Sequence, residues 1–288
     1  MSDPVLIRRF ASAFAAAALV AGCAQAPGDR AGAAQRMYVF SCGESRTPDV
    51  SRWSPGVNVG QPWEFSNNCY LIRHAKGLML WDAGLSDAIA AMPDGAVALG
   101  GLLRMRVPKT LASQLAEVGV KPAEVTHIAF SHFHADHVGN ANLFTAATLH
   151  IQEVEYAAAF GATPQKFGFL PVNYEKLRAS PAVKLKGDHD VFGDGSVVIL
   201  STPGHTPGHQ ALLVRLPKTG AVVLSGDMVH FQENWTNRRI PGMNFNRDQS
   251  ASSMERVAML ITTHKAQLWI NHDKAQSAGI RKAPAYFD

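Results

Sequence analysis

Short apolar runs recur along the chain and are separated by glycine, proline and polar residues. Runs of this length that are rich in β-branched and aromatic side chains are typical of buried strands. They predict strands at residues 37–40, 69–73, 77–81, 125–130, 148–151, 197–201, 211–215, 221–225 and 267–271. Between the second and third of these, Ala75-Lys76-Gly77 predicts the turn of a hairpin.

Helical patterns alternate with these strands in both halves of the chain. They predict helices at 110–117, ending near Gly119, at 152–160 and at 249–262. This alternation indicates an α/β protein in which two sheets pack together with helices outside. Ser86–Pro108 and Ala162–Tyr174 lack a regular pattern but are rich in apolar residues, so they either cover an apolar substrate or belong to the core.

The composition is that of a globular domain. Of 288 residues, 47% are hydrophobic and 17% are charged, so the chain can bury a large core. The formal net charge is only +4, and no cluster of Lys and Arg with interleaved aromatic residues stands out. We therefore expect one folded domain over residues 37–288 and no nucleic-acid partner.

The beginning of the sequence has the features of a targeting segment. Arg8-Arg9 precedes the apolar stretch 10–20, which is too short to span a bilayer, and Val20-Ala21-Gly22-Cys23 resembles a bacterial lipobox. We expect residues 1–22 to be a signal peptide, Cys23 to carry lipid, and 23–36 to be a flexible tether. The protein would then be anchored to a membrane in the bacterial periplasm, the outer membrane being favoured. Secretion without lipid is the alternative.

The two remaining cysteines leave two readings open. In an oxidising compartment, Cys42 and Cys69 can form a disulfide between the first two strands. Cys69 lies within a predicted strand, so a buried free thiol is the other reading.

The strongest chemical signal is Ser131-His132-Phe133-His134-Ala135-Asp136-His137, directly after the strand predicted at 125–130. Imidazole nitrogens and carboxylate oxygens suit a divalent ion such as zinc. Four such side chains in one loop are more than a single tetrahedral ion with an open water position requires. The run therefore favours two metal ions.

Further candidate ligands follow other predicted strands. His205 follows the strand at 197–201, Asp227 follows the strand at 221–225, and His272 follows the strand at 267–271. Loops at strand ends can converge at one edge of a sheet on rigid supports. This repeated placement predicts a single metal centre assembled from both halves of the chain.

The motifs H-x-H-x-D-H, T-P-G-H, S-G-D and N-H-D resemble those of the metallo-β-lactamase superfamily over about residues 37 to 288. Cys69-Tyr70-Leu71-Ile72, Trp81-Asp82-Ala83-Gly84-Leu85 and the doubled turn 202–210 are most similar to the N-acyl homoserine lactonases. The resemblance implies an αββα sandwich. It also implies that His132, His134 and His205 hold one zinc, that Asp136, His137 and His272 hold the other, and that Asp227 bridges both.

The resemblance further implies a hydrolase that opens a lactone ring, most simply an N-acyl homoserine lactone, by attack of a metal-bridging hydroxide. Asp136 and His230 are the candidate catalytic residues; many relatives have tyrosine where this chain has His230. Imidazole can donate a hydrogen bond to the substrate carbonyl or protonate the leaving alkoxide. A solvent-facing loop histidine is the alternative. Asp227 argues against true zinc β-lactamases, which usually lack a carboxylate there.

Other interpretations stay open for the activity, and other histidines need a role. The same metals could hydrolyse another lactone, a β-lactam, a thioester or a phosphate ester, and other divalent ions could replace zinc. A zinc-binding lipoprotein without catalysis is the alternative from another class. His209 is expected beside the ligands or in a structural role. The remaining histidines are expected to be ordinary ones: His127, His150, His189 and His264.

Overall fold

The computed structural model describes Met1 and residues 33–288. The predicted signal peptide, the lipid site at Cys23 and most of the tether therefore lie outside the described residues. The strand β1, Ala34–Thr47, begins three residues before the expected boundary at residue 37. Ala34 is buried and pairs with His74 of β2, Trp63–His74, so the sheet recruits the last residues of the predicted tether.

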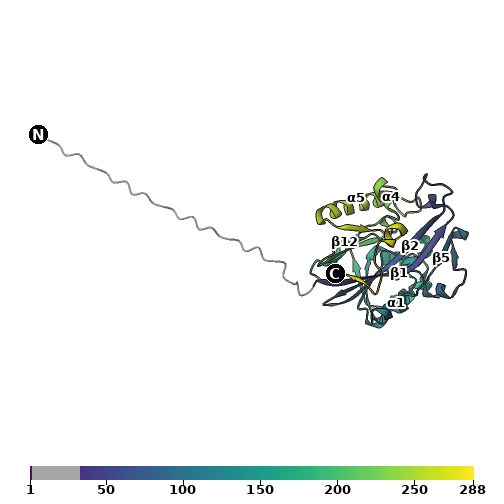
Figure 1. Ribbon diagram of the computed structural model, residues 1–288, viewed down its shortest axis with the longest axis horizontal. Coiled ribbons are helices and arrows are strands. Elements are labelled where there is room, and N and C mark those ends of the chain that lie inside the picture. Colours follow the sequence, from purple (N-terminus) through teal and green to yellow (C-terminus); the bar gives the residue numbers. More distant parts are fainter. Residues whose placement is uncertain (2–32) are drawn as a thin grey trace. The chain divides into compact units, whose positions relative to one another are not determined.

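Two mixed sheets make up the described fold (Figure 1). The first has the strand order β4-β5-β1-β2-β3-β6-β7-β8, with β14 also paired to β1. Its further strands are β3 Gly77–Trp81, β4 Ala96–Ala98, β5 Leu103–Arg106, β6 His127–Ala129, β7 Thr148–Gln152, β8 Ala182–Leu185 and β14 Tyr286–Phe287.

The second sheet has the order β13-β12-β11-β10-β9. Its strands are β9 His189–Asp190, β10 Val197–Ser201, β11 Gln210–Leu216, β12 Gly220–Leu224 and β13 Gln267–Trp269. The α-helices are α1 Leu111–Glu117, α2 Ala135–Val138, α3 Glu153–Phe160, α4 Gln232–Asn237, α5 Arg247–His264 and α6 Lys274–Ala278. In Figure 1, α5 covers the sheet that contains β12, and α1 lies on the opposite side, against the sheet that contains β1 and β2.

Side chains of successive strand residues point to opposite faces, and this alternation builds three apolar layers. In β1, Met37 and Val39 face the second sheet, whereas Tyr38 and Phe40 face α1. The second sheet packs in the same way, and its outer face contacts Met254 of α5. The fold is therefore an αββα sandwich, as the sequence predicts. None of the described helices is long and apolar enough to cross a membrane.

The segment predicted to be irregular at Ser86–Pro108 contains the short strands β4 and β5. β5 pairs with the polar end of β1, from Glu44 to Arg46, which has no apolar pattern of its own. Leu102 and Leu103 are partly buried and pack against a cluster that contains Phe65 and Phe231. Sequence patterns miss such short strands near the end of a sheet because pairing with neighbours, and not burial of an apolar run, holds them in place.

Candidate metal centre

Four loops meet at one edge of the sandwich, and each follows a strand. His132 and His134 lie just after β6, and Asp136 and His137 occupy the single turn of α2. The other three residues follow strands of the second sheet: His205 after β10, Asp227 after β12 and His272 after β13. The structure thus brings together all seven residues that the sequence singles out as ligands.

The first group consists of three imidazoles and one oxygen of Asp227. His134 Nδ1 lies 2.7 Å from His132 Nε2 and 3.1 Å from His205 Nε2. Asp227 Oδ2 lies 3.3 Å from His205 Nε2 and 3.8 Å from His132 Nε2. Four ligand-type atoms therefore surround a space of the size that one ion with bonds of about 2.0–2.2 Å requires.

The second group uses the other oxygen of the same carboxylate. Asp227 Oδ1 lies 3.0 Å from His272 Nε2 and 3.1 Å from His137 Nε2. Asp136 Oδ2 lies 3.5 Å from His272 Nε2 and 3.7 Å from His137 Nε2. Each oxygen of Asp227 thus faces a different group, which is the arrangement expected of a carboxylate shared by two ions.

The buried atoms of the centre fit a pair of cations. His137 Nε2 and Asp227 Oδ1 are both buried, and neither takes part in a hydrogen bond within the described residues. Burial alone would raise the pKa of Asp227, but the surrounding imidazoles, His272 first among them, hold it well below its ordinary value. Burial lowers the pKa of His132 and His205 well below the ordinary value, so both present the neutral imidazole that binds metals.

The outer nitrogen of each ligand imidazole has a partner that fixes the orientation of the ring. His205 Nδ1 contacts Asn244 Oδ1 at 3.0 Å, and His272 Nδ1 donates to the Ser66 carbonyl at 2.8 Å. His134 Nε2 donates to the carbonyl of Phe167 at 3.0 Å. A ring held in this way keeps its other nitrogen directed at the centre.

Asp82 orients the ring of His137 in the same way. The Oδ2 atom of Asp82 lies 3.0 Å from His137 Nδ1. The same carboxylate accepts hydrogen bonds from the Ser131 amide at 2.6 Å and from the Ser131 hydroxyl at 3.1 Å. Asp82 has a φ of 58°, in the left-handed region that is uncommon for residues other than glycine. This backbone conformation is a local cost that the three bonds offset.

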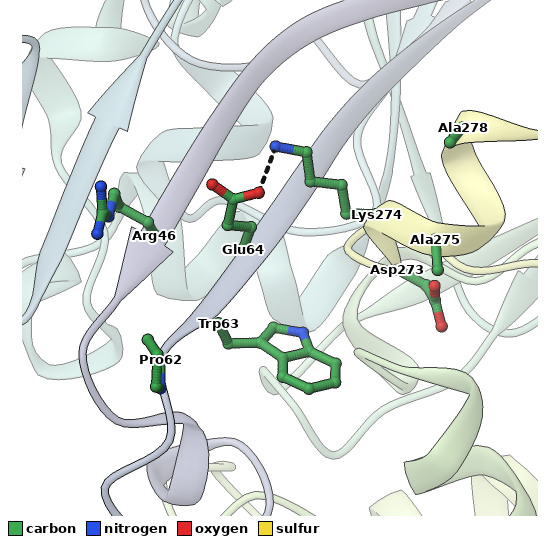
Figure 2. Close-up of a pocket in the computed structure, with 8 residues that line it drawn as sticks. All are labelled: Arg46, Pro62, Trp63, Glu64, Asp273, Lys274, Ala275 and Ala278. Atoms are coloured by element: carbon green, nitrogen blue, oxygen red, sulfur yellow. Dashed lines mark hydrogen bonds and ion pairs between the residues drawn. The ribbon is translucent and has the colours of Figure 1, made fainter.

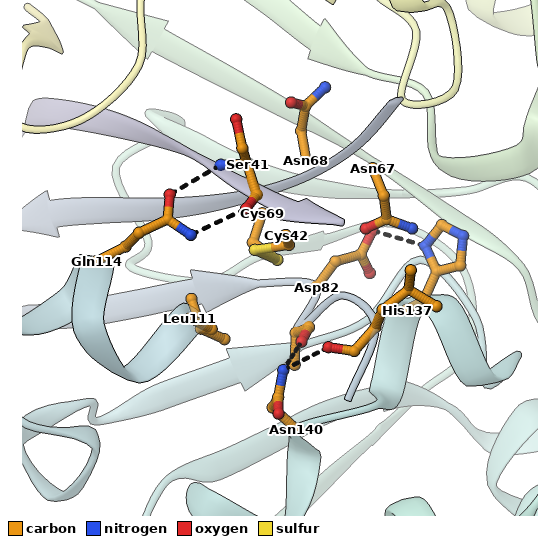
Figure 3. Close-up of a disulfide and its surroundings, with 12 residues drawn as sticks. Ser41, Cys42, Asn67, Asn68, Cys69, Asp82, Leu111, Gln114, His137 and Asn140 are labelled. Carbon is orange, nitrogen blue, oxygen red and sulfur yellow. Dashed lines mark hydrogen bonds and ion pairs between the residues drawn. A yellow bond between two sulfur atoms is a disulfide. The ribbon is translucent and has the colours of Figure 1, made fainter. Parts of the chain in front are cut away.

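A disulfide between Cys42 and Cys69 lies beside the Asp82 loop (Figure 3). The sequence left this bond and a free thiol as equal alternatives. Gly84 of the loop packs so closely on the disulfide that a Cβ there would lie 2.3 Å from Cys42 Cβ. Asn140 closes the other side by donating 2.8 Å hydrogen bonds to the carbonyls of Ala83 and Leu85. The loop that orients His137 is therefore held on both sides.

His209 and Gly226 support Asp227 from behind. The Asp227 amide donates to His209 Nε2 at 2.9 Å, and His209 Nδ1 contacts the Thr202 hydroxyl at 2.9 Å. A Cβ on Gly226, whose φ is +51°, would lie 2.4 Å from Ser131 Cβ and 2.8 Å from His209 Nε2. The backbone before Asp227 consequently has no space for a side chain. His209 contacts the backbone of Asp227 and is not part of either ligand group.

His230 lies inside the centre and is not a surface histidine. It is 2% exposed, and its Nε2 lies 3.2 Å from Asp227 Oδ2. Its ring is stacked on that of His272, with 5.6 Å between centroids. Its Nδ1 is buried and has no hydrogen-bond partner among the described residues. The position three residues beyond Asp227 thus faces the same space as the ligands.

Glu155 is a residue of this region that sequence reasoning missed. It is 1% exposed and accepts hydrogen bonds from Phe133 N, Thr206 Oγ1 and Gly208 N, all in ligand-bearing loops. Burial raises its pKa to about 7, against the lowering effect of these bonds. A glutamate early in a helix resembles an ordinary capping residue, so the sequence offers no signal for this role.

Three of the histidines expected to be ordinary gather at the other end of β6, together with His74. We call the four residues His74, His127, His150 and His189 the far-end cluster. His127 Nδ1 lies 3.0 Å from His150 Nε2, and His189 stacks on His150 with 5.4 Å between ring centroids. His74 Nε2 pairs with Asp194 at 2.9 Å. These residues form no ligand group of the kind seen at the centre.

A cavity of about 680 Å³ lies beside the His272 loop (Figure 2). Its lining includes Asp273, Trp63 and the ion pair between Lys274 and Glu64, which are 2.8 Å apart. None of the seven candidate ligands lines it. Trp63 also contacts Phe231, the residue after His230, with 5.2 Å between ring centroids. Aromatic side chains therefore stand between this charged cavity and the centre.

Comparison with known proteins gives a consistent family. The profile of the metallo-beta-lactamase superfamily matches residues 62–264. The N-acyl homoserine lactonase AttM of Azorhizobium caulinodans is 31% identical over 268 residues, which cover 88% of this chain and 98% of that protein. The N-acyl homoserine lactonase of Bacillus cereus is also 31% identical, with the same coverage.

Solved structures support the same assignment. An N-acyl homoserine lactone hydrolase, solved with N-hexanoyl-L-homoserine at its catalytic metal centre, superimposes with a TM-score of 0.75 and 25% identity. The alignment covers 88% of this chain and 99% of that one. A quorum-quenching N-acyl homoserine lactone lactonase gives a TM-score of 0.75 and 26% identity over 88% and 98% of the two chains.

Proposed function

The chain belongs to the metallo-beta-lactamase superfamily, and from this premise we propose that it is a metal-dependent hydrolase that opens N-acyl homoserine lactones. The observation that carries the proposal is the division of Asp227 between two ligand groups, in a chain that covers 98% of its lactonase relatives. The substrate class follows from those relatives, and the metal-dependent hydrolysis also follows from the geometry.

The ligand set fits two zinc ions. One ion would be held by His132, His134 and His205. The other would be held by Asp136, His137 and His272, and Asp227 would contribute to both. When bound, such a pair supplies Lewis acidity and a water whose pKa is lowered to near neutrality. Nitrogen-rich sites of this type also accept other divalent ions, so zinc is the proposed identity because of its fit to imidazole and carboxylate.

The protein's own residues would then orient the lactone and move its protons. His230 Nε2 faces the same space as Asp227 Oδ2, so it can donate a hydrogen bond to the ring carbonyl in the transition state. Asp136 is the more accessible carboxylate, with a side chain 29% exposed against 6% for Asp227. It can accept a proton during attack and return it to the alkoxide as the ring opens.

Apolar side chains beside the centre provide a surface for an acyl chain. Phe167, whose carbonyl binds His134, lies 5.8 Å from Phe245 between ring centroids, and Phe245 is 56% exposed. Leu102 and Leu103 pack against the cluster that contains Phe231, the residue after His230. Replacing both leucines by serine should harm long-chain lactones more than short ones if they cover the chain. An equal loss for all lengths would assign them to the core.

A substrate panel tests the proposed function. Zinc-loaded protein is offered lactones of several acyl-chain lengths beside β-lactams, thioesters and phosphodiesters, and metal content is measured on the same sample. We expect N-acyl homoserine lactones to be turned over fastest, with two equivalents of metal. Faster turnover of another class would replace the substrate but keep the hydrolase. No turnover of any class, with two metals bound, would favour a binding protein.

We also propose that the enzyme is a periplasmic lipoprotein anchored at Cys23, most simply to the outer membrane. The support is the apolar stretch 10–20 followed by the lipobox-like sequence 20–23. Metabolic labelling with a radioactive fatty acid should label the wild type and not Cys23→Ser. Label that persists in the variant, or a soluble unlabelled wild type in the periplasm, would contradict the anchor.

A further inference from the structure

Glu155 is a buried carboxylate that the proposed reaction does not use. It is the third residue of α3 and is 1% exposed. It lies between two loops that belong to different sheets: the loop after β6, with His132 and His134, and the loop after β10, with His205. No sequence motif joins these loops, so their relative position depends on contacts of this kind.

The two oxygens of Glu155 bind both loops. Oε1 accepts hydrogen bonds from Phe133 N at 3.2 Å and from Thr206 Oγ1 at 2.9 Å, and Oε2 accepts one from Gly208 N at 2.7 Å. Phe133 stands between His132 and His134, and Thr206 follows His205. One carboxylate thus sets the distance between the backbones that carry three ligand imidazoles.

The second loop is also pressed directly onto the start of α3. A Cβ at Gly208 would lie 2.6 Å from Glu155 Cβ and 2.7 Å from Glu155 N. Such contacts leave no freedom for the loop to move toward the helix. The hydrogen bonds oppose movement away from it.

From these contacts we propose that Glu155 is a positioning residue for the first ligand group, His132, His134 and His205, and that it sets the affinity of that group for its ion. The inference rests on the proposed two-metal function. The imidazoles of the second group are oriented by other residues, because His137 contacts Asp82 and His272 contacts the Ser66 carbonyl. Loss of Glu155 should therefore affect the two ions unequally.

Glu155→Gln is the informative variant because it keeps the shape of the side chain. An amide has one acceptor oxygen, so at least one of the two backbone amides, Phe133 N or Gly208 N, would face an NH₂ group in place of an acceptor. Glu153→Gln is the matched control. It is the same substitution on the same helix, at an exposed residue whose partner is Lys186, 3.2 Å away.

The measurement is the binding of Co²⁺ to chelator-treated full-length protein, followed by its visible absorption, with zinc affinity determined by competition with a chromophoric chelator. We expect Glu155→Gln to weaken one of the two equivalents by about 10–100-fold, the range typical of losing a partner of a metal ligand. The absorption of that equivalent should also change. Glu153→Gln should match the wild type.

Thr206→Val supplies a second, gentler variant because it removes only the hydroxyl bond. It should weaken the same equivalent by a smaller factor. If Glu155→Gln binds both equivalents like Glu153→Gln, the proposal is wrong. If it weakens both equally and lowers the melting temperature of the metal-free protein, the carboxylate serves the fold in general and the proposal is also wrong.

These outcomes are independent of the substrate. Wild-type protein that binds two equivalents of Co²⁺ but opens no lactone would defeat the proposed function and leave the role of Glu155 intact. Lactonase activity in the wild type together with unchanged metal binding in Glu155→Gln would defeat the role of Glu155 alone.

Discussion

The described part of the chain contains two groups of buried and half-buried histidines at opposite ends of β6, and only one of them is built to hold metal. At the metal centre, imidazole nitrogens converge on the carboxylate of Asp227, and the outer nitrogens have partners of their own. In the far-end cluster, His127 and His150 contact each other at 3.0 Å, and His74 is the one histidine of the four that pairs with Asp194. A central carboxylate and oriented rings distinguish the two, whereas a high density of histidines does not.

The two groups also differ in the pKa values of their histidines, as His137 and His150 illustrate. At the centre, Asp227, Asp82 and Asp136 overcome the effect of burial and raise the pKa of His137 well above its ordinary value. At the far end, burial and then the neighbouring His127 and His189 together lower the pKa of His150 to about 4. The carboxylates of the centre therefore favour positive charge at His137, although burial keeps His132 and His205 neutral, whereas His150 at the far end stays neutral. Four substitutions test this comparison, from the largest expected effect to the smallest.

Removing the central carboxylate should cause the largest loss. Asp227→Ala leaves both groups without their shared oxygen, and no other described carboxylate reaches both. Metal content should fall from two equivalents to fewer than one, with a loss of affinity beyond the roughly 100-fold seen for outer partners, and most turnover should disappear. Elemental analysis and turnover measure this. Asp194→Ala, which removes the carboxylate beside His74, is the control and should keep both ions. Full metal and full turnover in Asp227→Ala would break the comparison.

His230→Ala tests whether His230, which lies in the centre but is not a proposed ligand, contributes to catalysis. Losing one hydrogen-bond donor to a developing oxyanion should lower turnover by roughly 10²–10³, with metal content unchanged. His230→Tyr should restore much of the rate, because a phenol can donate the same bond. If the alanine variant keeps nearly all of its activity, His230 contributes no more to catalysis than the far-end cluster does. Activation of the carbonyl would then fall to the bound ions alone.

Asp82→Asn should weaken the second ion by about 10–100-fold while the first is retained, because an amide has only one acceptor oxygen for Ser131 and the His137 ring. Zinc competition titration resolves the two equivalents. The control is Asp87→Asn, the same change at a carboxylate that caps α1 through Leu111 N and contacts no ligand. Equal affinities in the two variants would show that His137 needs no oriented ring.

His150→Gln should leave metal content unchanged and alter only the pH dependence of stability. The pKa of His150 is about 4 in the folded state, against an ordinary value of 6.5, so the folded protein resists protonation. Its contribution to stability is therefore present above about pH 6.5 and is lost as pH falls toward 4. Between pH 7 and pH 5 the wild type should lose about 2 kcal/mol more than the variant. Urea unfolding at both pH values measures this, and parallel losses would show that His150 is not excluded from charge.

The sequence predicts the ligands better than their supports, for a physical reason. His132, His134, Asp136 and His137 share one loop, and the others follow strands that an apolar run makes visible. Asp82 and Glu155 act through a few hydrogen bonds to loops distant in sequence, and such bonds leave no periodic pattern in the sequence. The disulfide has the same limit: whether Cys42 reaches Cys69 depends on the register of β1 on β2, which shifts between Ser41 and Glu44.

The two ligand groups draw on both sheets of the sandwich. His134 and His137 come from loops of the first sheet, and His205, Asp227 and His272 from loops of the second. Each ion would thus cross-link the two sheets at an edge where side-chain packing otherwise holds them together. Chelation should consequently speed amide hydrogen exchange where the sheets face each other at this edge. The same metal–ligand bonds would then hold the two sheets together and support hydrolysis.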